Sequence, residues 1–250
     1  MERESDRLVE LRNGMRSSKS LIITGGWAHD FASTAPLVAE HLRGAGFDVS
    51  VVNDVDSSAQ AMQVELFDLI VVYACWFQMT DPRYTDEIRS RWSRSTSPEW
   101  RTALQRQRDA GAGLLAMHTA VICFDDSPEW AEWVGGTWIW GESTHPAPGE
   151  VTLVPLTEHP IVSGIGEFVV HDERYVRIGR HAHTTVLVES TGGGEAHPNA
   201  WAYERGSSRV VYSALGHDER SLNDETHRLL IQRSARWVSG GSDAEIRAMN

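Results

Sequence analysis

The sequence predicts an α/β fold built on a doubly wound, mostly parallel β-sheet. Short apolar runs alternate with helical stretches along the first half of the chain, which is the pattern of βα units. One run, FDLIVVYAC at residues 67–75, is apolar almost throughout, as is typical of a parallel strand covered on both faces. The 250 residues are enough for one well-filled core, and no repeat or linker divides them. We therefore expect a single domain over residues 19–240.

The first half of the chain predicts four buried strands and two helices, after a polar N-terminal extension at residues 1–18. Gly44 and Gly46 end the first helix, because glycine readily adopts the left-handed conformation at a helix C-terminus. Ser97 and Pro98 begin the second helix, and Gly111 stops it. The predicted strands cover residues 20–24, 48–52, 67–75 and 112–118, and the predicted helices cover residues 33–45 and 98–109.

The second half of the chain predicts shorter strands and a closing helix. The tryptophan-rich and glycine-rich residues 130–141 predict a short helix and a loop near the ligand-binding end of the sheet. The last two strands are joined at Arg205-Gly206, and this tight spacing predicts a C-terminal β-hairpin. An amphipathic helix at residues 225–238 closes the domain, and residues 241–250 are left as a C-terminal tail. The predicted strands cover residues 150–156, 168–170, 185–189, 200–204 and 209–214.

Composition and charge exclude several classes of protein. With 23 Lys and Arg against 35 Asp and Glu, the net charge of −12 argues against nucleic acid as a partner. No run reaches the roughly 18 apolar residues of a membrane helix, and the charged N-terminus has no secretory signal. The two cysteines, Cys75 and Cys123, rule out a disulfide scaffold. We expect a cytoplasmic protein that takes an uncharged or weakly charged small molecule, and a homo-oligomer is compatible with the sequence.

Histidines follow three of the predicted strands, at the sheet edge where open parallel sheets bind ligands. They are His29, His118 and His217. The segment GLLAMHTA at residues 113–120 resembles a nucleophile elbow, in which a strand turns sharply into a helix and exposes one side chain. Histidine stands where serine or cysteine would be, so it can act as a general acid or base or bind a metal.

A metal site is an alternative use of these histidines. The sequence contains no HExxH or similarly spaced pair, no phosphate-binding loop and no GxGxxG motif. The sequence therefore requires no cofactor, although it allows a bound divalent metal. If a metal is bound, we expect His118, His217 and nearby carboxylates to hold it. The other histidines considered as ligands are His29, His145 and His171.

Five segments, taken in order and spacing, resemble one known family over residues 20–238. The chain is similar to the trehalose-utilisation (ThuA-like) family, whose fold resembles flavodoxin-like and class I glutamine amidotransferase domains. His118 stands where the amidotransferases have their cysteine nucleophile, and His217-Asp218-Glu219 stands where they have a His-x-Glu pair. Glutamine hydrolysis is therefore not expected. The matching segments are LIITGGWAHDF, GAGLLAMHTA, EHPIVSGIGEFVVHDERYVRI, SRVVYSALGHDER and RSARWV.

The resemblance implies a carbohydrate-processing enzyme that acts on a glycoside or a 3-keto-glycoside during disaccharide utilisation. A 3-ketone acidifies the neighbouring C–H bonds, and His118 and His217 supply a base and an acid with ordinary pKa values near neutrality. Asp218 or Glu219 is expected to orient His217. The reaction class is left open among hydrolase, lyase and isomerase. Two alternatives also stay open: a sugar-binding or regulatory module without activity, and a metal-dependent hydrolase.

The remaining site residues are predicted from the resemblance and from the surplus of 10 Trp. The family pattern Asp-Glu-x-Tyr places Asp172, Glu173 and Tyr175 in the site, with Glu173 as a catalytic group. Indole rings give a flat apolar surface on which a sugar can stack. The residues predicted to bind substrate are Trp27, His29, Asp30, Trp76, Trp138, Trp140, Asp172, Tyr175, Asp218 and Glu219.

Overall fold

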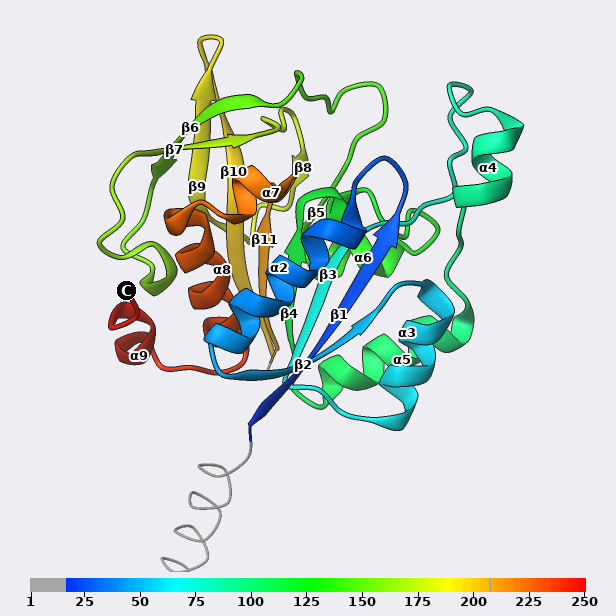
Figure 1. Cartoon of the computed structure of the whole chain (residues 1–250), viewed down its shortest axis with the longest axis horizontal. Helices are drawn as coiled ribbons and strands as arrows, with labels where there is room; N and C mark the ends of the chain where they lie inside the picture. The colour runs from blue at the N-terminus through cyan, green and yellow to red at the C-terminus, as the bar shows by residue number, and fades with distance from the viewer. Residues whose placement is uncertain (1–16, 207) are drawn as a thin grey trace, which may run out of the picture.

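A nine-stranded mixed sheet with helices on both faces forms the centre of the molecule (Figure 1). The computed structural model describes residues 17–206 and 208–250. The strand order is β2-β1-β3-β4-β11-β10-β9-β6-β7, and the first five strands are mutually parallel. The order of these five is that of flavodoxin-like folds, in which ligands bind where the strand order reverses. The predicted α/β class is confirmed.

The parallel part of the sheet contains the strands predicted from continuous apolar runs. Its strands are β1 (Ser18–Gly26), β2 (Phe47–Val52), β3 (Leu69–Cys75), β4 (Gly113–Met117) and β11 (Ser208–Ser213). Most of the predicted polar extension, residues 1–16, lies outside the described residues, and Ser18 already belongs to β1. Every residue of β3 and β4 is buried, because helices cover both faces of the sheet there.

Helices cover the two faces in separate groups. Helices α2 (Phe31–Gly44) and α8 (Glu225–Val238) pack on one face, and α3 (Val55–Val64), α5 (Pro98–Asp109) and α6 (Pro128–Val134) pack on the other. The helices predicted before β2, before β4 and at the end of the sheet are confirmed as α2, α5 and α8. The sequence reading missed α3 and α4 (Asp86–Trp92), although Asp54 and Thr85 cap them as N-cap residues normally do.

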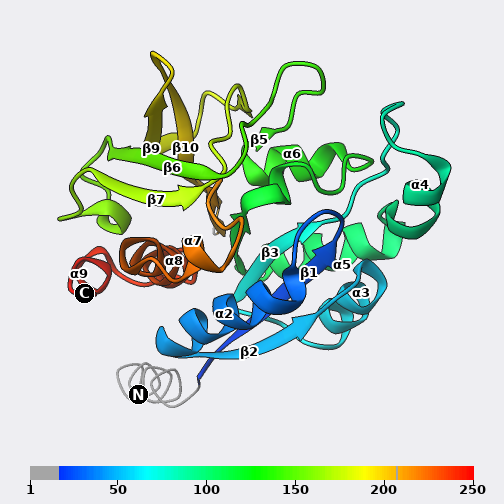
Figure 2. The ribbon, with the colours of Figure 1, turned by 45° about the horizontal axis from the view of Figure 1, so that its top comes forward.

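Four strands extend the sheet in antiparallel fashion beyond β11. They are β10 (Glu195–Arg205), β9 (Thr185–Gly192), β6 (Gly149–Pro155) and β7 (Phe168–Asp172), and the predicted β10–β11 hairpin is confirmed. Figure 2 shows β6, β7, β9 and β10 grouped on one side of the molecule, with β1, β2 and α2 on the other. A separate pair is formed by β5 (Gly136–Thr137) and β8 (Gly179–Arg180).

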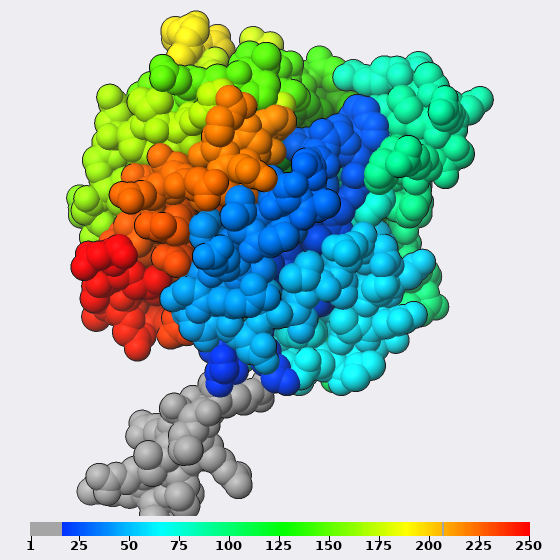
Figure 3. Space-filling model, in the orientation of Figure 1, coloured from blue at the N-terminus to red at the C-terminus, as the bar shows by residue number. Residues whose placement is uncertain are grey.

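Short helical segments complete the fold and bring distant parts of the chain together. They are η1 (His118–Val121), η2 (Pro160–Val162), α7 (Glu219–Leu222) and α9 (Asp243–Arg247). Helix α9 lies within the residues expected to form a tail, and its Ile246 is completely buried. Figure 3 shows α2, in blue, beside α7, in orange, on one face of the molecule. In the described part of the chain, no helix is long and apolar enough to cross a membrane.

Candidate active site

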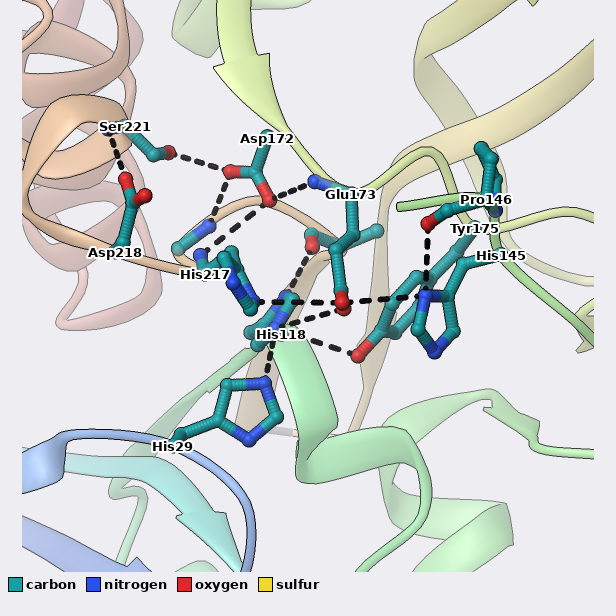
Figure 4. Close-up of polar contacts among 12 residues, drawn as sticks. His29, His118, His145, Pro146, Asp172, Glu173, Tyr175, His217, Asp218 and Ser221 are labelled. Carbon is teal, nitrogen blue, oxygen red and sulfur yellow. Dashed lines mark hydrogen bonds and ion pairs between the residues drawn. The ribbon is translucent and has the colours of Figure 1, made fainter. Parts of the chain in front are cut away.

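Three histidines from three parallel strands and one glutamate from an antiparallel strand converge on one point (Figure 4). His29 follows β1, His118 follows β4, and His217 follows β11. Glu173 follows β7, which lies at the far edge of the sheet but contacts α7. The loops after the parallel strands all leave the same edge of the sheet, so their histidines meet there, as the sequence predicts.

His118 occupies the tight turn predicted at the end of β4. Its φ of 53° lies in the left-handed region, which is unfavourable for a residue with a Cβ and is often found at functional sites. Two hydrogen bonds hold this turn: the Tyr212 hydroxyl donates to the His118 carbonyl at 3.0 Å, and the Thr119 hydroxyl donates to the Ala74 carbonyl at 2.7 Å. The backbone geometry aims the imidazole across the end of the sheet.

The hydrogen bonds of His118 and His29 fix their tautomers. Nδ1 of His118 lies 2.8 Å from the Ala214 carbonyl, and Nδ1 of His29 lies 3.3 Å from the Trp27 carbonyl. A carbonyl oxygen only accepts, so both Nδ1 atoms carry hydrogen, and each neutral ring has its lone pair on Nε2. These two Nε2 atoms face each other at 3.0 Å. Both lone pairs therefore point into the site.

Glu173 lies at the centre of the cluster. Its Oε2 is 3.5 Å from Nε2 of His118, while its Oε1 is 3.5 Å from Nδ1 of His217 and 3.2 Å from Nδ1 of His145. The Tyr175 hydroxyl is 3.4 Å from the same Nε2 of His118. The predicted catalytic residues His118, His217 and Glu173 are thus brought together.

Burial sets the charge state of this cluster. It lowers the pKa of His118 and that of His29 to about 3, and it also lowers the pKa of His217. Burial and the nearby Asp172 carboxylate raise the pKa of Glu173 to about 7. At neutral pH the three imidazoles are therefore uncharged, and Glu173 can both hold and release a proton.

Asp172 is completely buried and acts on the loop rather than on a ligand. Its carboxylate accepts hydrogen bonds from the backbone N–H of Glu173 at 2.6 Å, of Gly216 at 2.7 Å and of His217 at 3.3 Å, and from the Ser221 hydroxyl. Asp172 was predicted from the sequence to bind the substrate. The structure instead makes it the residue that holds the Glu173 and His217 backbones together.

A pocket of about 310 Å³ opens in front of Glu173. Trp27, Trp138, Trp140 and Tyr175, all predicted to bind substrate, line it. Aromatic rings make up much of its wall, which suits the apolar face of a sugar ring. His29, Glu173 and His217 line it as well. The lining residues that were not predicted from the sequence as substrate contacts also include Ala28, Cys75, Phe77, Arg83, Tyr84, Thr119 and Ile122.

His145 also lines this pocket, although the sequence reading treated it only as a possible metal ligand. It lies in the loop before β6, where no periodic pattern marks a residue as part of a site. Its side chain is 38% exposed, and its Nδ1 contacts both Glu173 and the Pro146 carbonyl. His171, considered beside it, does not join the cluster, since neighbouring residues of a strand such as His171 and Asp172 point to opposite faces.

Trp76 does not lie in the pocket. It is buried in the core on the opposite side of β3, where its Nε1 donates to the Thr24 carbonyl at 3.1 Å and its ring packs near Trp92. Cys75 and Phe77, its neighbours in sequence, line the pocket. The expectation of a stacking platform at Trp76 is corrected: side chains alternate along an extended chain, and this indole falls on the helix-covered face.

Three predicted carboxylates lie outside the aromatic pocket. Asp30 caps α2, Asp218 caps α7 and pairs with Arg220 at 2.7 Å, and Glu219 is exposed. All three line a shallow groove beside the site, which His29 and His217 share. Neither Asp218 nor Glu219 is hydrogen bonded to His217, so the carboxylate that faces its imidazole is Glu173.

Four side chains of the cluster can hold a metal ion. His29, His118, His217 and Glu173 each offer one ligand atom, and these atoms all lie within 4.8 Å of one another. Imidazole nitrogen with one carboxylate oxygen is a common ligand set for zinc and other divalent transition metals. The same atoms can serve as proton donors and acceptors.

Comparisons with solved structures find similar folds at low sequence identity. A ThuA-like protein from Parabacteroides merdae aligns with a TM-score of 0.73 and 18% identity, covering 90% of this chain and 91% of that one. A ThuA-like protein from Bacteroides uniformis gives 0.64 and 17%, covering 91% and 95%. A β-galactosidase from Halorubrum lacusprofundi gives 0.56 and 14%, covering 90% of this chain but 31% of that one.

The family comparison covers most of the chain. A comparison with proteins of curated function found no significant match. The sequence model of the ThuA family, described as trehalose utilisation, matches residues 19–238. This span contains the three converging histidines and the glutamate. The chain therefore belongs to the ThuA family.

Proposed function

We propose that the protein is a carbohydrate-processing enzyme that acts on a glycoside or a 3-keto-glycoside in disaccharide utilisation. One observation carries this proposal: the Glu173 carboxylate, with His118, His145 and His217 around it, lines a pocket with aromatic walls. A proton-transfer group beside a stacking surface is what a sugar-modifying enzyme needs. The family's association with trehalose utilisation agrees with it.

A 3-ketone makes the glycosidic bond breakable by proton transfer alone. A base removes the proton on C2, the electrons form a C1–C2 double bond, and the C1–O bond breaks. An acid protonates the departing oxygen, so the products are an enone and a free alcohol of the second sugar. The protein must therefore supply one proton acceptor and one proton donor on either side of C1 and C2.

The cluster offers both functions. Glu173 accepts a proton as the carboxylate and donates it as the acid, and Nε2 of His118, which is buried behind the pocket lining, lies 3.5 Å from its Oε2. His217 and His145 are 22% and 38% exposed, so they can exchange protons between Glu173 and solvent. The choice of base and acid between these groups depends on the orientation of the sugar.

The two thiols do not take part in this chemistry. Burial raises the pKa of Cys75 to about 12, so it stays protonated at the pocket wall. Cys123 is buried, and its Sγ donates to the Ala74 carbonyl at 3.0 Å. His118 occupies the turn where a thioester-forming cysteine would stand. Glutamine hydrolysis by a cysteine nucleophile therefore lacks its nucleophile.

A direct assay tests the proposal. The protein is incubated with a 3-keto disaccharide and with the unoxidised disaccharide, and enone absorbance and released monosaccharide are followed. We expect conversion by the wild type, and a fall of about 10²–10⁴-fold in kcat for Glu173→Gln and His118→Ala. His197→Ala is the matched control, because His197 also pairs with a carboxylate, Glu195 at 3.3 Å, but lies outside the pocket. Equal rates in all variants, or no conversion of either sugar, would contradict the proposal.

A further inference from the structure

The contact between His29 and His118 is unfavourable without a third partner. Both rings carry hydrogen on Nδ1, where each faces a backbone carbonyl. Their Nε2 lone pairs are therefore directed at each other across 3.0 Å. Two acceptors at this distance repel each other unless a proton or a cation lies between them. The backbone bonds fix the rings, so the repulsion is built into the fold.

His217 and Glu173 bring two more ligand atoms to the same point. Nδ1 of His217 is buried and has no hydrogen-bond partner among residues 17–206 and 208–250, and it faces Glu173 Oε1 at 3.5 Å. Buried polar atoms are normally satisfied, so this one calls for a ligand. The ion pairs of Glu173 within the same residues are all with histidines, and no Lys or Arg neutralises it.

Three of the separations are close to those around a single metal ion. Two ligand atoms about 2.0–2.1 Å from one ion are about 2.8–3.4 Å apart when they are at right or tetrahedral angles. The His29–His118 distance is 3.0 Å, and both His118–Glu173 and His217–Glu173 are 3.5 Å. The four atoms come from four different segments of the chain and still lie within 4.8 Å of one another.

The surroundings of the cluster also have the form of a metal site. Metal-binding histidines usually donate their second ring N–H to a backbone carbonyl or a carboxylate, which fixes the ring and the tautomer. His118 does this with Ala214, and His29 does it with Trp27. Asp172 fixes the backbones of Glu173 and His217 by accepting their N–H groups. Three of the four ligands face the open pocket, so a bound ion is accessible to substrate.

We infer that His29, His118, His217 and Glu173 form a binding site for one divalent transition-metal ion, of the class of Zn²⁺, Mn²⁺, Fe²⁺ or Co²⁺. Three imidazoles disfavour Mg²⁺ and Ca²⁺, which prefer oxygen ligands. The site itself stands on geometry; its use in sugar chemistry rests on the proposed function. There, the ion would polarise the 3-keto oxygen and so acidify the C2 proton.

His145 would have a role separate from that of the four ligands. It lines the pocket and contacts Glu173, but it is not one of the four ligands. With the other groups on the metal, His145 is the imidazole left free to carry a proton. Replacing it is expected to lower turnover and to leave metal binding intact, whereas replacing a ligand affects both.

Metal binding by the full-length protein provides the test. The protein is stripped with a chelator and titrated with Zn²⁺ by calorimetry and with Co²⁺ by visible absorption. We expect one equivalent of each ion and a Co²⁺ spectrum of low-symmetry nitrogen and oxygen ligation. In His29→Ala and His217→Ala the Kd is expected to rise by at least about tenfold. His145→Ala and His197→Ala are expected to bind as the wild type does. Thermal melts establish that each variant is folded.

The outcomes separate this inference from the proposed function. If the wild type binds no stoichiometric ion, or if His29→Ala and His217→Ala bind as tightly as the wild type, the metal site is wrong. Sugar conversion that persists after chelation then leaves the proposed function standing. If the ion binds as expected but no 3-keto sugar is converted, the metal site stands and the proposed substrate is wrong.

Discussion

The carboxylate of Asp172 accepts hydrogen bonds from the backbone N–H groups of both Glu173 and His217. It therefore joins β7 to the loop after β11. We expect Asp172→Asn to lower the free energy of unfolding by about 1–3 kcal/mol, because its amide nitrogen cannot accept the hydrogen bonds of the oxygen that it replaces. Oδ1 accepts from Glu173 and His217, and Oδ2 accepts from Gly216 and Ser221. The variant should also lower kcat, and it should weaken Zn²⁺ binding, since two ligands lose their support. Urea unfolding, kinetics and calorimetry measure the three effects.

Asp218→Asn is the control for this prediction. Asp218 also accepts backbone hydrogen bonds, at the start of α7, but its side chain is not bonded to His217 or Glu173. We expect it to lose stability while keeping kcat and Zn²⁺ affinity. If Asp172→Asn loses stability but keeps its kcat and its Zn²⁺ affinity, Asp172 has a structural role only.

Substitution of two tryptophans is expected to affect different properties, stability for Trp76 and substrate binding for Trp140. Trp140 lines the pocket and is 37% exposed, whereas Trp76 is buried in the core. Trp76→Ala is expected to cost about 3–5 kcal/mol of stability, as large-to-small core substitutions do. Trp140→Ala is expected to raise KM for the sugar and to cost little stability. Denaturant unfolding and steady-state kinetics measure both, and a stability loss of equal size in the two variants would contradict the placement of Trp140.

Both thiols should be dispensable for activity. We expect the Cys75→Ala and Cys123→Ala double variant to retain most of the conversion of a 3-keto disaccharide, since neither sulfur holds the position of a nucleophile. Both thiols are buried, so the native protein should resist alkylation. Loss of activity in a double variant that melts like the wild type would point to a cysteine-dependent reaction instead.

Acid should destabilise the fold through its buried histidines. Burial lowers the pKa of His41 below its ordinary value of about 6.5, so the unfolded chain binds a proton there that the folded protein excludes. The contribution of His41 to stability is therefore complete above about pH 6.5, and it is lost as the pH falls from there towards the folded pKa.

His41→Gln isolates the pH-dependent contribution of His41 to stability. Glutamine does not titrate and can still donate to the Leu222 carbonyl, which Nε2 of His41 approaches at 2.8 Å. The measurement is the urea midpoint at about pH 7.5 and about pH 5, on either side of the ordinary histidine pKa. We expect the variant to lose less stability than the wild type when the pH is lowered from the higher to the lower of these values. Identical losses would assign the acid sensitivity to other groups, such as His227 and His159.

The sequence predicted the parallel part of the fold because strands such as β3 and β4 are buried on both faces and therefore read as uninterrupted apolar runs. It missed α3 and α4, and α4 buries no residue, so no apolar stripe marks it. Residues 241–250 were expected to form a tail, although they contain α9, which buries one residue, Ile246. A single buried residue leaves no periodic signal.

The site was predictable where position along a strand decides it. His29, His118 and His217 were found because the ends of parallel strands meet at one edge. Trp76 was misplaced because one step along a strand changes the face, and no pattern in a fully apolar run shows which face holds the pocket. Arg83, Tyr84 and His145 lie on loops, whose path depends on tertiary packing. Asp218 was predicted to bind substrate, but it caps α7, because capping and substrate binding use the same residue type.

The position of Glu173 at the end of the sheet's last strand has a consequence for folding kinetics. His29 and His118 are already 89 residues apart in sequence, and Glu173 follows β7, which is separated from β11 in the sheet by β10, β9 and β6. Contacts of such high sequence separation form late, because the loop-closure entropy must be overcome first. A ligand held by all four segments binds only the completed sheet, and by mass action it makes the parallel and antiparallel halves unfold as one cooperative unit.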